Sequence, residues 1–489
     1  MSSPKAVGAI GNLERIALLF AAAAVVFQCF VPPTVGLADN GDFPKIAGQL
    51  DVGNPLFSKD VVRFADLKYV VDSKYHWNSQ FYSSELLLFA AAFGLDSIRG
   101  KPETFDLRLL GAIHAAIFLL AFYRLLPLLN SLRPALRMVL LCLILLFFTD
   151  VMYVAYFNSF FMDTGALLFL LLAVVSFLRA LRWQKPLDRW LFVASSMLLV
   201  TSKTQHFLLG IPIAMLLACK GGLLTHGRGW AFRTFSAIAV LAAIAFSNRF
   251  GAPAHYPTLG SYTVIFFELL PKSKDVSSDL KDLGLDDSYK QYVGTNAYSP
   301  GAPVQDPERR EVLKPKVSYA HIARFFIKHP SRAVEATVLR MGNAGMQRPY
   351  AGNYDKRAGF AEYAQTRAFT VWSALKARFF GGRGARYIFY SLFVALAPAA
   401  FAIVRRKSLP SGIPEAMIAL ASMALIALLV ASLADALDAE RHYSLFSALT
   451  DLSLICGVSL SATMFTPART PTPIHHPASE APRPGTIEP

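Results

Sequence analysis

The chain has 489 residues, of which 54% are hydrophobic and only 17% carry a charge, and its mean hydropathy is +0.40. A soluble protein of ordinary composition has about a quarter charged residues, so this composition excludes that class. The net charge of +15 would favour a nucleic-acid partner in a soluble chain, but in a membrane protein Lys and Arg collect in cytoplasmic loops. We therefore expect a polytopic membrane protein that contacts the lipid bilayer and binds no nucleic acid.

Ten apolar runs have lengths that suit, or approach, a hydrocarbon core about 30 Å thick. They lie near residues 13–33, 106–129, 136–157, 160–181, 189–202, 205–219, 232–248, 386–404, 414–434 and 443–463. The fifth and sixth runs are short, which indicates helices that are tilted or interrupted around Thr201 to Gln205. The predicted fold is an all-α bundle of about ten transmembrane helices.

Basic residues predict the orientation of this bundle. With residues 1–12 in the cytoplasm, every short loop that falls inside is basic, as the positive-inside rule requires. These loops contain Arg124, Arg133, Arg137, Arg179, Arg182, Lys185, Arg189, Lys220, Arg228, Arg233, Arg405, Arg406 and Lys407. An N-terminal transmembrane module (13–248) then contains a first extracytoplasmic loop (34–105), and a larger extracytoplasmic loop (249–385) precedes the C-terminal helices (386–463).

The first apolar run, a run within the first loop and the C-terminal residues need separate interpretation. The first apolar run partly resembles a signal peptide with a small-residue site ending at Ala38, but it is long enough to remain as a helix, which we favour. The run YSSELLLFAAAFGL (82–95) is too short to span comfortably and predicts an interfacial or re-entrant helix. The Pro- and Thr-rich residues 464–489 lack hydrophobic periodicity and predict a disordered cytoplasmic tail.

Polar side chains gather at the outer ends of the predicted spans. They occur in LADNGDFPKI (37–46), YFNSFFMD (156–163), SKTQH (202–206) and DALDAERHYS (435–444). Each stretch alone has a structural explanation, because Asp caps helices and Lys snorkels to the headgroup level. Since all four turns are polar and a bundle would bring them to one membrane face, we predict a functional site there.

The residue types in these turns suit a lipid-phosphate substrate, whose phosphate lies at this depth. Arg441 would match a phosphate through its planar fork of donors, and Lys203 would add a point charge. Asp42 is the predicted general base for an acceptor hydroxyl, and Asp39 is the alternative. The other predicted substrate contacts at these turns are His442, Gln205, His206, Asn158 and Asp163.

Cofactor signals are few. The chain has no P-loop, GxSxG, HExxH or metal-spaced Cys and His set. Mg²⁺ or Mn²⁺ on Asp39 or Asp42 is conceivable because carboxylates suit these ions, but two acids without a third ligand do not predict a metal site. His114 and Asp451 lie deeper in the second and tenth spans, where they could form a proton relay or a polar contact between helices.

The order of the motifs ADNGDFPKIAG, YFNSFFMDTGALLFLLL, TSKTQ, MQRPYAGNYD and ERHYSLFSALTD resembles the GT-C superfamily of integral-membrane glycosyltransferases. Within it, these motifs look most like those of bacterial surface-glycan hexose transferases, over most of residues 13–463. The resemblance implies that the chain transfers a hexose, with inversion, from a polyprenyl-phosphate donor to an extracytoplasmic glycan or lipid-linked acceptor. It also implies a bacterial cytoplasmic (inner) membrane with the active site on the extracytoplasmic face.

By the same resemblance, Asp42 is the base that deprotonates the acceptor, and Arg441 and His442 contact the donor phosphate. MQRPYAGNYD adds three contacts to the sugar or the acceptor, namely Arg348, Asn353 and Tyr354. The chain departs from the family pattern because Asp39 and Asp42 are isolated and do not form a tight acidic pair.

Other functions remain open on the sequence alone. A transporter or flippase of lipid-linked sugars would place binding groups near the midplane, often with internal repeats, whereas this chain concentrates charge at one face. An O-antigen-type polymerase shares the compartment and partners of a glycosyltransferase. A non-enzymatic scaffold would leave the polar outer turns without a use.

Overall fold

Long helices packed side by side dominate the computed structural model, which describes residues 11–55, 63–100, 102–130, 132–225, 229–344 and 352–462. The bundle is formed by α1 (Asn12–Phe30), α4 (Leu107–Leu129), α5 (Pro134–Phe148), α7 (Met162–Trp183), α8 (Pro186–Val200), α9 (Gly210–Lys220), α10 (Trp230–Phe250), α17 (Gly384–Val404), α18 (Ile413–Leu433) and α20 (Ser444–Ala462). Within the described ranges, eight helical segments are long and apolar enough to cross a membrane, and one bent pair would make a ninth. The prediction of an all-α polytopic membrane protein is confirmed.

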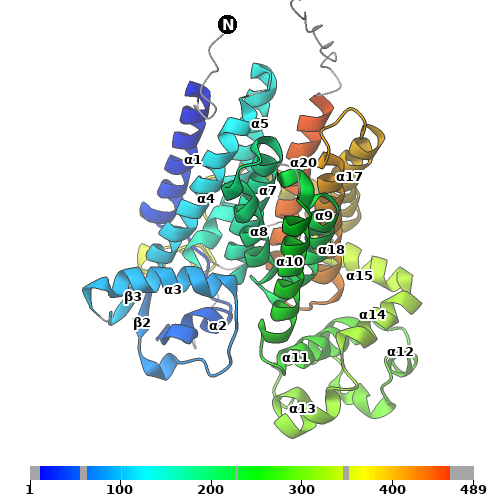
Figure 1. Cartoon of the computed structure of the whole chain (residues 1–489). Helices are drawn as coiled ribbons and strands as arrows, with labels where there is room; N and C mark the ends of the chain where they lie inside the picture. Colours follow the sequence, from blue (N-terminus) through cyan, green and yellow to red (C-terminus); the bar gives the residue numbers. More distant parts are fainter. Residues whose placement is uncertain are drawn as a thin grey trace, which may run out of the picture.

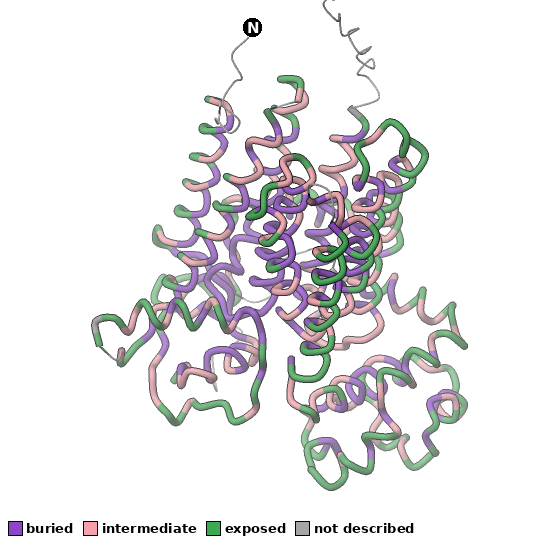
Figure 2. The backbone as a smooth tube through the Cα atoms, viewed as in Figure 1, coloured by how far each residue is buried: buried purple, intermediate pink, exposed green. Residues whose placement is uncertain are grey.

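The burial pattern is that of a bundle surrounded by lipid. Helix α7 is the most enclosed span, with 78% of its apolar window buried, whereas α10 has only 28% buried. Buried residues concentrate where the helices pack together, and exposed residues lie on their outward faces (Figure 2). Large apolar side chains on those outward faces, such as Phe20, Phe235 and Phe389, are exposed. Lipid tails would cover such side chains in a membrane.

The third predicted span differs from its prediction. Residues 136–157 do not form one helix, because α5 ends at Phe148 and the chain bends by 48° before Val151–Asn158. Asp150 lies at the break, where its carboxylate accepts a hydrogen bond from the backbone N–H of Met152 at 2.9 Å. This cap begins a new short helix, α6 (Val151–Val154), followed by the 3₁₀ turn η4 (Ala155–Asn158).

The fifth and sixth predicted spans are present as helices but are short. Helix α8 has 15 residues, which span about 22 Å at about 1.5 Å per residue. It ends at Val200, and the next segment begins as a 3₁₀ helix, η5 (Thr204–Leu209), before α9 and η6 (Gly221–Leu224). The interruption that the sequence indicated between these two spans is therefore real.

Both large segments lie at one end of the bundle. Figure 1 shows that α1 begins and α20 ends at the opposite end, at the top of the view. The residues between α1 and α4 and those between α10 and α17 lie at the lower end. Helix α8 packs against α7 within the bundle, although it is shorter than the eight span-length segments of the described residues.

The first segment combines short helices with a small sheet. Its elements are α2 (Pro44–Ala47), η1 (Gly48–Leu50), β1 (Val52–Gly53), β2 (Lys68–Val71), η2 (Ser73–Tyr75), α3 (Ser84–Asp96), η3 (Ser97–Arg99) and β3 (Thr104–Asp106). The strands form an antiparallel sheet in the order β1-β2-β3. Helix α3 corresponds to the predicted interfacial helix, and it lies across the end of the bundle (Figure 1).

Aromatic packing fixes the first segment onto the bundle. Phe160, from the turn before α7, contacts Phe43, Tyr69 and Phe89 with ring centroids 5.0–5.5 Å apart and near-perpendicular planes. Such edge-to-face pairs add about 0.5–1.5 kcal/mol each beyond their buried area. This contact places the residues just before α2 directly beside the start of α7.

The second segment has an apolar core of its own, which includes Tyr262, Phe266 and Phe325. Its elements are α11 (Tyr256–Thr263), the π-helix η7 (Val264–Leu269), η8 (Leu270–Lys272), α12 (Val276–Asp282), η9 (Asp287–Tyr292), η10 (Pro303–Gln305), α13 (Pro307–Leu313), α14 (Tyr319–Lys328), α15 (Pro330–Ala344), η11 (Lys356–Ala358) and α16 (Val371–Phe380). The chain then enters α17, and α19 (Ala439–His442) leads into α20.

The two deep ionisable residues make polar contacts between elements. His114 lies 2.8 Å from a carboxylate oxygen of Glu85 and 2.8 Å from the carbonyl oxygen of Phe157. Asp451 accepts hydrogen bonds from the side chains of Lys376 at 2.9 Å and Trp372 at 2.9 Å. Both residues thus make polar contacts between segments of the fold.

Candidate active site

The four polar turns meet at the lower end of the bundle. They bring together Asp42, in the turn before α2; Asp163, in the first turn of α7; Lys203, between α8 and η5; and Arg441, in α19. We call these four residues the charged cluster. The predicted convergence of the outer turns is thus present in the fold.

Arg441 lies at the centre of the charged cluster. One of its guanidinium nitrogens, Nη2, pairs with Oδ2 of Asp42, and the other, Nη1, lies 3.4 Å from Oδ2 of Asp163. Lys203 Nζ approaches the second oxygen of Asp163 at 3.2 Å. The guanidinium also lies 4.5 Å from the ring centroid of Phe161. This cation–π contact stabilises the positive charge of Arg441. The side chain of Arg441 is therefore held by both carboxylates and one aromatic ring.

Lys45 is a partner of Asp42 that the sequence reasoning missed. Its Nζ pairs with Oδ1 of Asp42 and donates to the hydroxyl of Tyr256 at 2.9 Å. The ammonium also lies 4.9 Å from the ring centroid of Tyr256. The spacing of three residues between Asp42 and Lys45 at the start of α2 was a signal for this pair. Tyr256 belongs to α11, so the second large segment also contributes to the site.

The two acids of the first turn have opposite electrostatic environments. Burial opposes ionisation of Asp42, but Lys45 and Arg441 outweigh it and hold the pKa of Asp42 well below its usual range. Burial raises the pKa of Asp39 to about 7, although the backbone N–H groups of Phe43 and Gly41 work against this rise. Asp42 is consequently ionised at neutral pH, whereas Asp39 is close to half protonated.

Asp39 has a clear local role. Its Oδ1 accepts hydrogen bonds from the backbone N–H groups of Gly41 at 2.8 Å and Phe43 at 3.1 Å. Gly41 has φ +97°, a conformation that glycine adopts at little cost. Asp39 thereby fixes the tight turn that presents Asp42 to Arg441.

A second polar group borders the charged cluster. His442 Nδ1 pairs with Asp435 Oδ2, and the same oxygen accepts a hydrogen bond from the side-chain amide of Gln205. Asp438 accepts hydrogen bonds from Asn40 and, at 3.4 Å, from Arg441. His442 and Gln205 were among the predicted contacts, but Asp435 and Asp438 were not, although both acids lie in the DALDAERHYS turn.

The chain matches the family model of the YfdI N-terminal transmembrane domain over residues 5–470. It belongs to this family. YfdI-family domains are associated with glycosyltransferase-like membrane proteins. No curated protein and no solved structure matches the chain. The family match therefore supports the broader part of the resemblance seen in the sequence motifs, a GT-C-like membrane glycosyltransferase family.

Two of the predicted substrate contacts of this YfdI-family chain, Asn158 and Asn353, make hydrogen bonds within the fold. The buried amide of Asn158 donates to the backbone carbonyls of Cys29 and Val35 at 2.9 and 2.8 Å. The amide of Asn353 donates to the carbonyl of Gly36 at 2.8 Å. Both asparagines thus tie the chain after α1 to the rest of the fold.

Three predicted substrate contacts remain, namely His206, Tyr354 and Arg348. His206 hydrogen-bonds Ser202 at 2.9 Å beside Lys203. The buried ring of Tyr354 stacks on Phe360 with centroids 4.1 Å apart. Arg348 lies outside the described residues.

The acids of the site do not form a metal cage. Across the described parts of the chain, no group of three or more His, Cys, Asp and Glu side chains could hold a metal ion. The oxygens of Asp42 and Asp163 instead face the cations Lys45, Lys203 and Arg441. In this arrangement the carboxylates position basic side chains.

Proposed function

We propose that this chain is a membrane glycosyltransferase that moves a hexose from a polyprenyl-phosphate donor to an extracytoplasmic glycan or lipid-linked acceptor. The observation that carries the proposal is the charged cluster, in which Arg441 and Lys203 lie beside the ionised Asp42 at one end of the membrane bundle. A phosphate-binding fork and a carboxylate in contact with each other are the two groups that this transfer requires.

The donor phosphate would bind at Arg441. The guanidinium pairs with Asp42 and Asp163, so that its charge is balanced although it is buried. A lipid phosphate offers the same bidentate geometry as a carboxylate. Its arrival would therefore replace one carboxylate contact and free the Asp42 carboxylate for the acceptor.

Asp42 would then act as the general base. The acceptor hydroxyl oxygen attacks the anomeric carbon of the donor hexose, and its proton passes to the Asp42 carboxylate. The bond between the anomeric carbon and the phosphate oxygen breaks, and its electron pair stays on the departing polyprenyl phosphate. Arg441 and Lys203 would stabilise the charge that develops on that phosphate. The Asp42 side chain is 19% exposed, the most open of the charged cluster, so an acceptor could reach it from water.

The position of the charged cluster suits a lipid-anchored donor. It lies at the end of the bundle that carries both large segments. The loops rich in Arg and Lys lie at the other end, which the positive-inside rule assigns to the cytoplasm. A phosphate carried by a polyprenyl chain would meet the cluster at the extracytoplasmic headgroup level.

Replacing the base tests this function. The substitution Asp42→Asn keeps the shape of the side chain but removes its proton-accepting charge, and general-base catalysis is worth about 10²–10⁴-fold in rate. We expect transfer of radiolabelled hexose from polyprenyl phosphate to fall by at least about 100-fold. The matched control is Asp287→Asn, at an Asp whose side chain is 63% exposed and pairs with Lys290 in the second segment. Wild-type transfer by the Asp42→Asn protein would exclude Asp42 as the base.

A further inference from the structure

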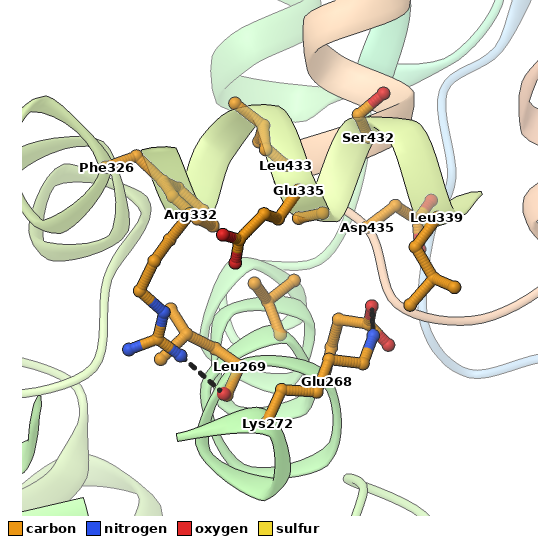
Figure 3. A pocket seen from close by; sticks show the side chains of 12 residues that line it. Glu268, Leu269, Lys272, Phe326, Arg332, Glu335, Leu339, Ser432, Leu433 and Asp435 are labelled. Carbon is orange, nitrogen blue, oxygen red and sulfur yellow. Dashed lines mark hydrogen bonds and ion pairs between the residues drawn. The ribbon is translucent and has the colours of Figure 1, made fainter. Parts of the chain in front are cut away.

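A pocket of about 270 Å³ lies between η7, α15 and the outer end of α18 (Figure 3). The residues that matter for its chemistry are Glu268, Lys272, Phe326, Glu335, Leu339 and Asp435. Ligand pockets for drug-sized molecules measure roughly 300–1,000 Å³. A pocket slightly below that range suits a smaller group, such as a single sugar residue.

Asp435 joins this pocket to the candidate active site. It lines the pocket, and the same carboxylate pairs with His442 and accepts from Gln205. His442 directly follows Arg441 in the chain. A second link comes from Ser432, another pocket residue, whose hydroxyl lies 2.7 Å from the hydroxyl of Tyr443. A ligand in the pocket could therefore contact Asp435, whose partner His442 is the neighbour of Arg441 in the chain.

Hydrogen bonds and ion pairs link the elements that frame the pocket. Arg340 Nε donates to Glu268 Oε1 at 3.1 Å, and Lys272 pairs with the same oxygen. Arg332 donates to the backbone carbonyl of Leu269 at 3.2 Å, as drawn in Figure 3, and pairs with Asp279. These contacts join η7 to α15, the two elements that contribute most of the pocket walls.

The pocket surface combines hydrogen-bonding groups with apolar faces. Glu335 is exposed on α15, and among the described residues its carboxylate has no hydrogen bond or ion pair. Together with Asp435 it offers acceptors for hydroxyl groups, while Lys272 offers a donor. Phe326 and Leu339 contribute apolar surface to the same pocket. A sugar ring has the same two kinds of surface, hydroxyl groups at its edge and C–H groups on its faces.

We propose that this pocket binds the terminal sugar of the acceptor glycan. The proposal rests on the proposed glycosyltransferase function and assigns the acceptor to a specific place in the fold. The pocket is built from the second large segment and the end of a span, so an acceptor could enter from water. The donor would lie on the other side of Asp435. Its phosphate would be held at Arg441, and its lipid would lie in the bilayer.

A substitution that fills the pocket tests the proposal. Leu339→Trp adds bulk at an exposed pocket residue of α15 and should leave the fold intact. Val334→Trp is the matched control, because Val334 is exposed on the same helix but does not line the pocket. The assay uses the full-length protein in membranes, radiolabelled polyprenyl-phosphate hexose as donor, and the glycolipid fraction of the producing cells as acceptor. We expect Leu339→Trp to raise the KM for acceptor at least tenfold and to leave the KM for donor unchanged.

A second variant tests the hydrogen-bonding surface of the pocket. Glu335→Gln removes an unpaired charge without changing size, and loss of a hydrogen bond to a charged group corresponds to roughly a tenfold weaker interaction. The same rise in acceptor KM is expected. An unchanged acceptor KM in both variants, or a rise in the donor KM, would overturn the pocket assignment. Absence of any hexose transfer by the wild-type protein would instead count against the proposed function itself.

Discussion

Asp39 and Asp42 are three residues apart, yet their surroundings prepare them for different tasks. Asp42 faces the side chains of Lys45 and Arg441, which keep it ionised. Burial of Asp39 raises its pKa to about 7, although the two backbone N–H groups that it accepts from lower it. We propose Asp42 as the reactive carboxylate because it belongs to the charged cluster and contacts Arg441, and Asp39 as the residue that shapes the turn because it accepts two backbone hydrogen bonds there.

The raised pKa of Asp39 predicts a pH-dependent stability. The pKa of an Asp in an unfolded chain is about 3.9. Between about pH 4 and 7, Asp39 in the folded chain therefore keeps a proton that the unfolded chain has lost. The contribution of Asp39 to the free energy of unfolding therefore falls as the pH rises through this window and stays low above it. Asp39→Asn removes this cost while its amide oxygen still accepts both N–H groups. We expect the gain in Tm to be larger at about pH 8 than at about pH 5.

Thermal unfolding of the purified protein at the two pH values measures this difference. Equal Tm shifts at both pH values would contradict the buried, protonatable state of Asp39. The same variant should keep hexose transfer, because its turn is preserved. Loss of transfer in Asp39→Asn with intact folding would make Asp39 the better candidate for the base.

Arg441 should be required for its shape as well as its charge. Lys cannot reproduce the planar fork that pairs with two carboxylates and stacks on Phe161. We expect Arg441→Lys to raise the KM for the polyprenyl-phosphate donor by about tenfold or more, the loss of one charge-assisted hydrogen bond. The KM for acceptor should not change. Arg357→Lys, at an exposed Arg paired with Asp355, serves as the control, and an unaltered donor KM at Arg441→Lys would remove its phosphate role.

At the scale of single residues, the sequence was sufficient to select all four residues of the charged cluster. Asp42, Asp163, Lys203 and Arg441 all lie at the ends of apolar runs, so the topology alone brought them to one face. Residues whose partners come from the folded loops were missed, as with Asp435, which meets Gln205 and His442 only in three dimensions. The asparagines selected beside them donate to backbone carbonyls, contacts that no sequence pattern signals.

At the scale of elements, α16 is held in the bundle by a buried ion pair. Lys376 donates to Asp451 at 2.9 Å and to Ser447 at 2.6 Å, and Tyr153 donates to the same carboxylate at 2.7 Å. Lys376 and Asp451 are almost fully buried. The final helix of the second segment is thereby anchored to α20.

Removing one partner of this pair should destabilise the protein strongly. Lys376→Met leaves the buried Asp451 without its cation, a change that typically costs about 3–5 kcal/mol. We expect a clearly lower Tm in thermal unfolding, whereas Lys314→Met, at a half-exposed surface pair with Glu311, should have little effect. A wild-type Tm for Lys376→Met would show that the pair does not hold α16 in place.

The elements themselves were largely predictable, because membrane spans are long apolar runs and their signal is strong. All ten predicted runs are helical in the structure. The third was wrong in its continuity, because Asp150 ends one helix and caps the next. The packing of the second large segment could not be predicted, since its small core depends on contacts such as Phe266 with Tyr292 that join separate short helices.

At the scale of the whole molecule, the fold places both large segments and the charged cluster at one end of a membrane bundle. The cations of the cluster would bind a phosphate at the level of lipid headgroups, and the pocket beside Asp435 would open toward water. This division between a lipid side and a water side is the basis for proposing a lipid-linked donor and a glycan acceptor. It also predicts that water-soluble nucleotide sugars are not the donor.

The most direct test is a donor comparison with the purified full-length protein in lipid vesicles. Radiolabelled hexose is supplied either as polyprenyl-phosphate hexose or as the nucleotide sugar, together with the glycolipid fraction of the producing cells. We expect label to pass to the glycolipid from the polyprenyl-phosphate donor only, with release of polyprenyl phosphate, and this transfer to be lost in Asp42→Asn. Transfer from the nucleotide sugar, or consumption of neither donor, would contradict the account.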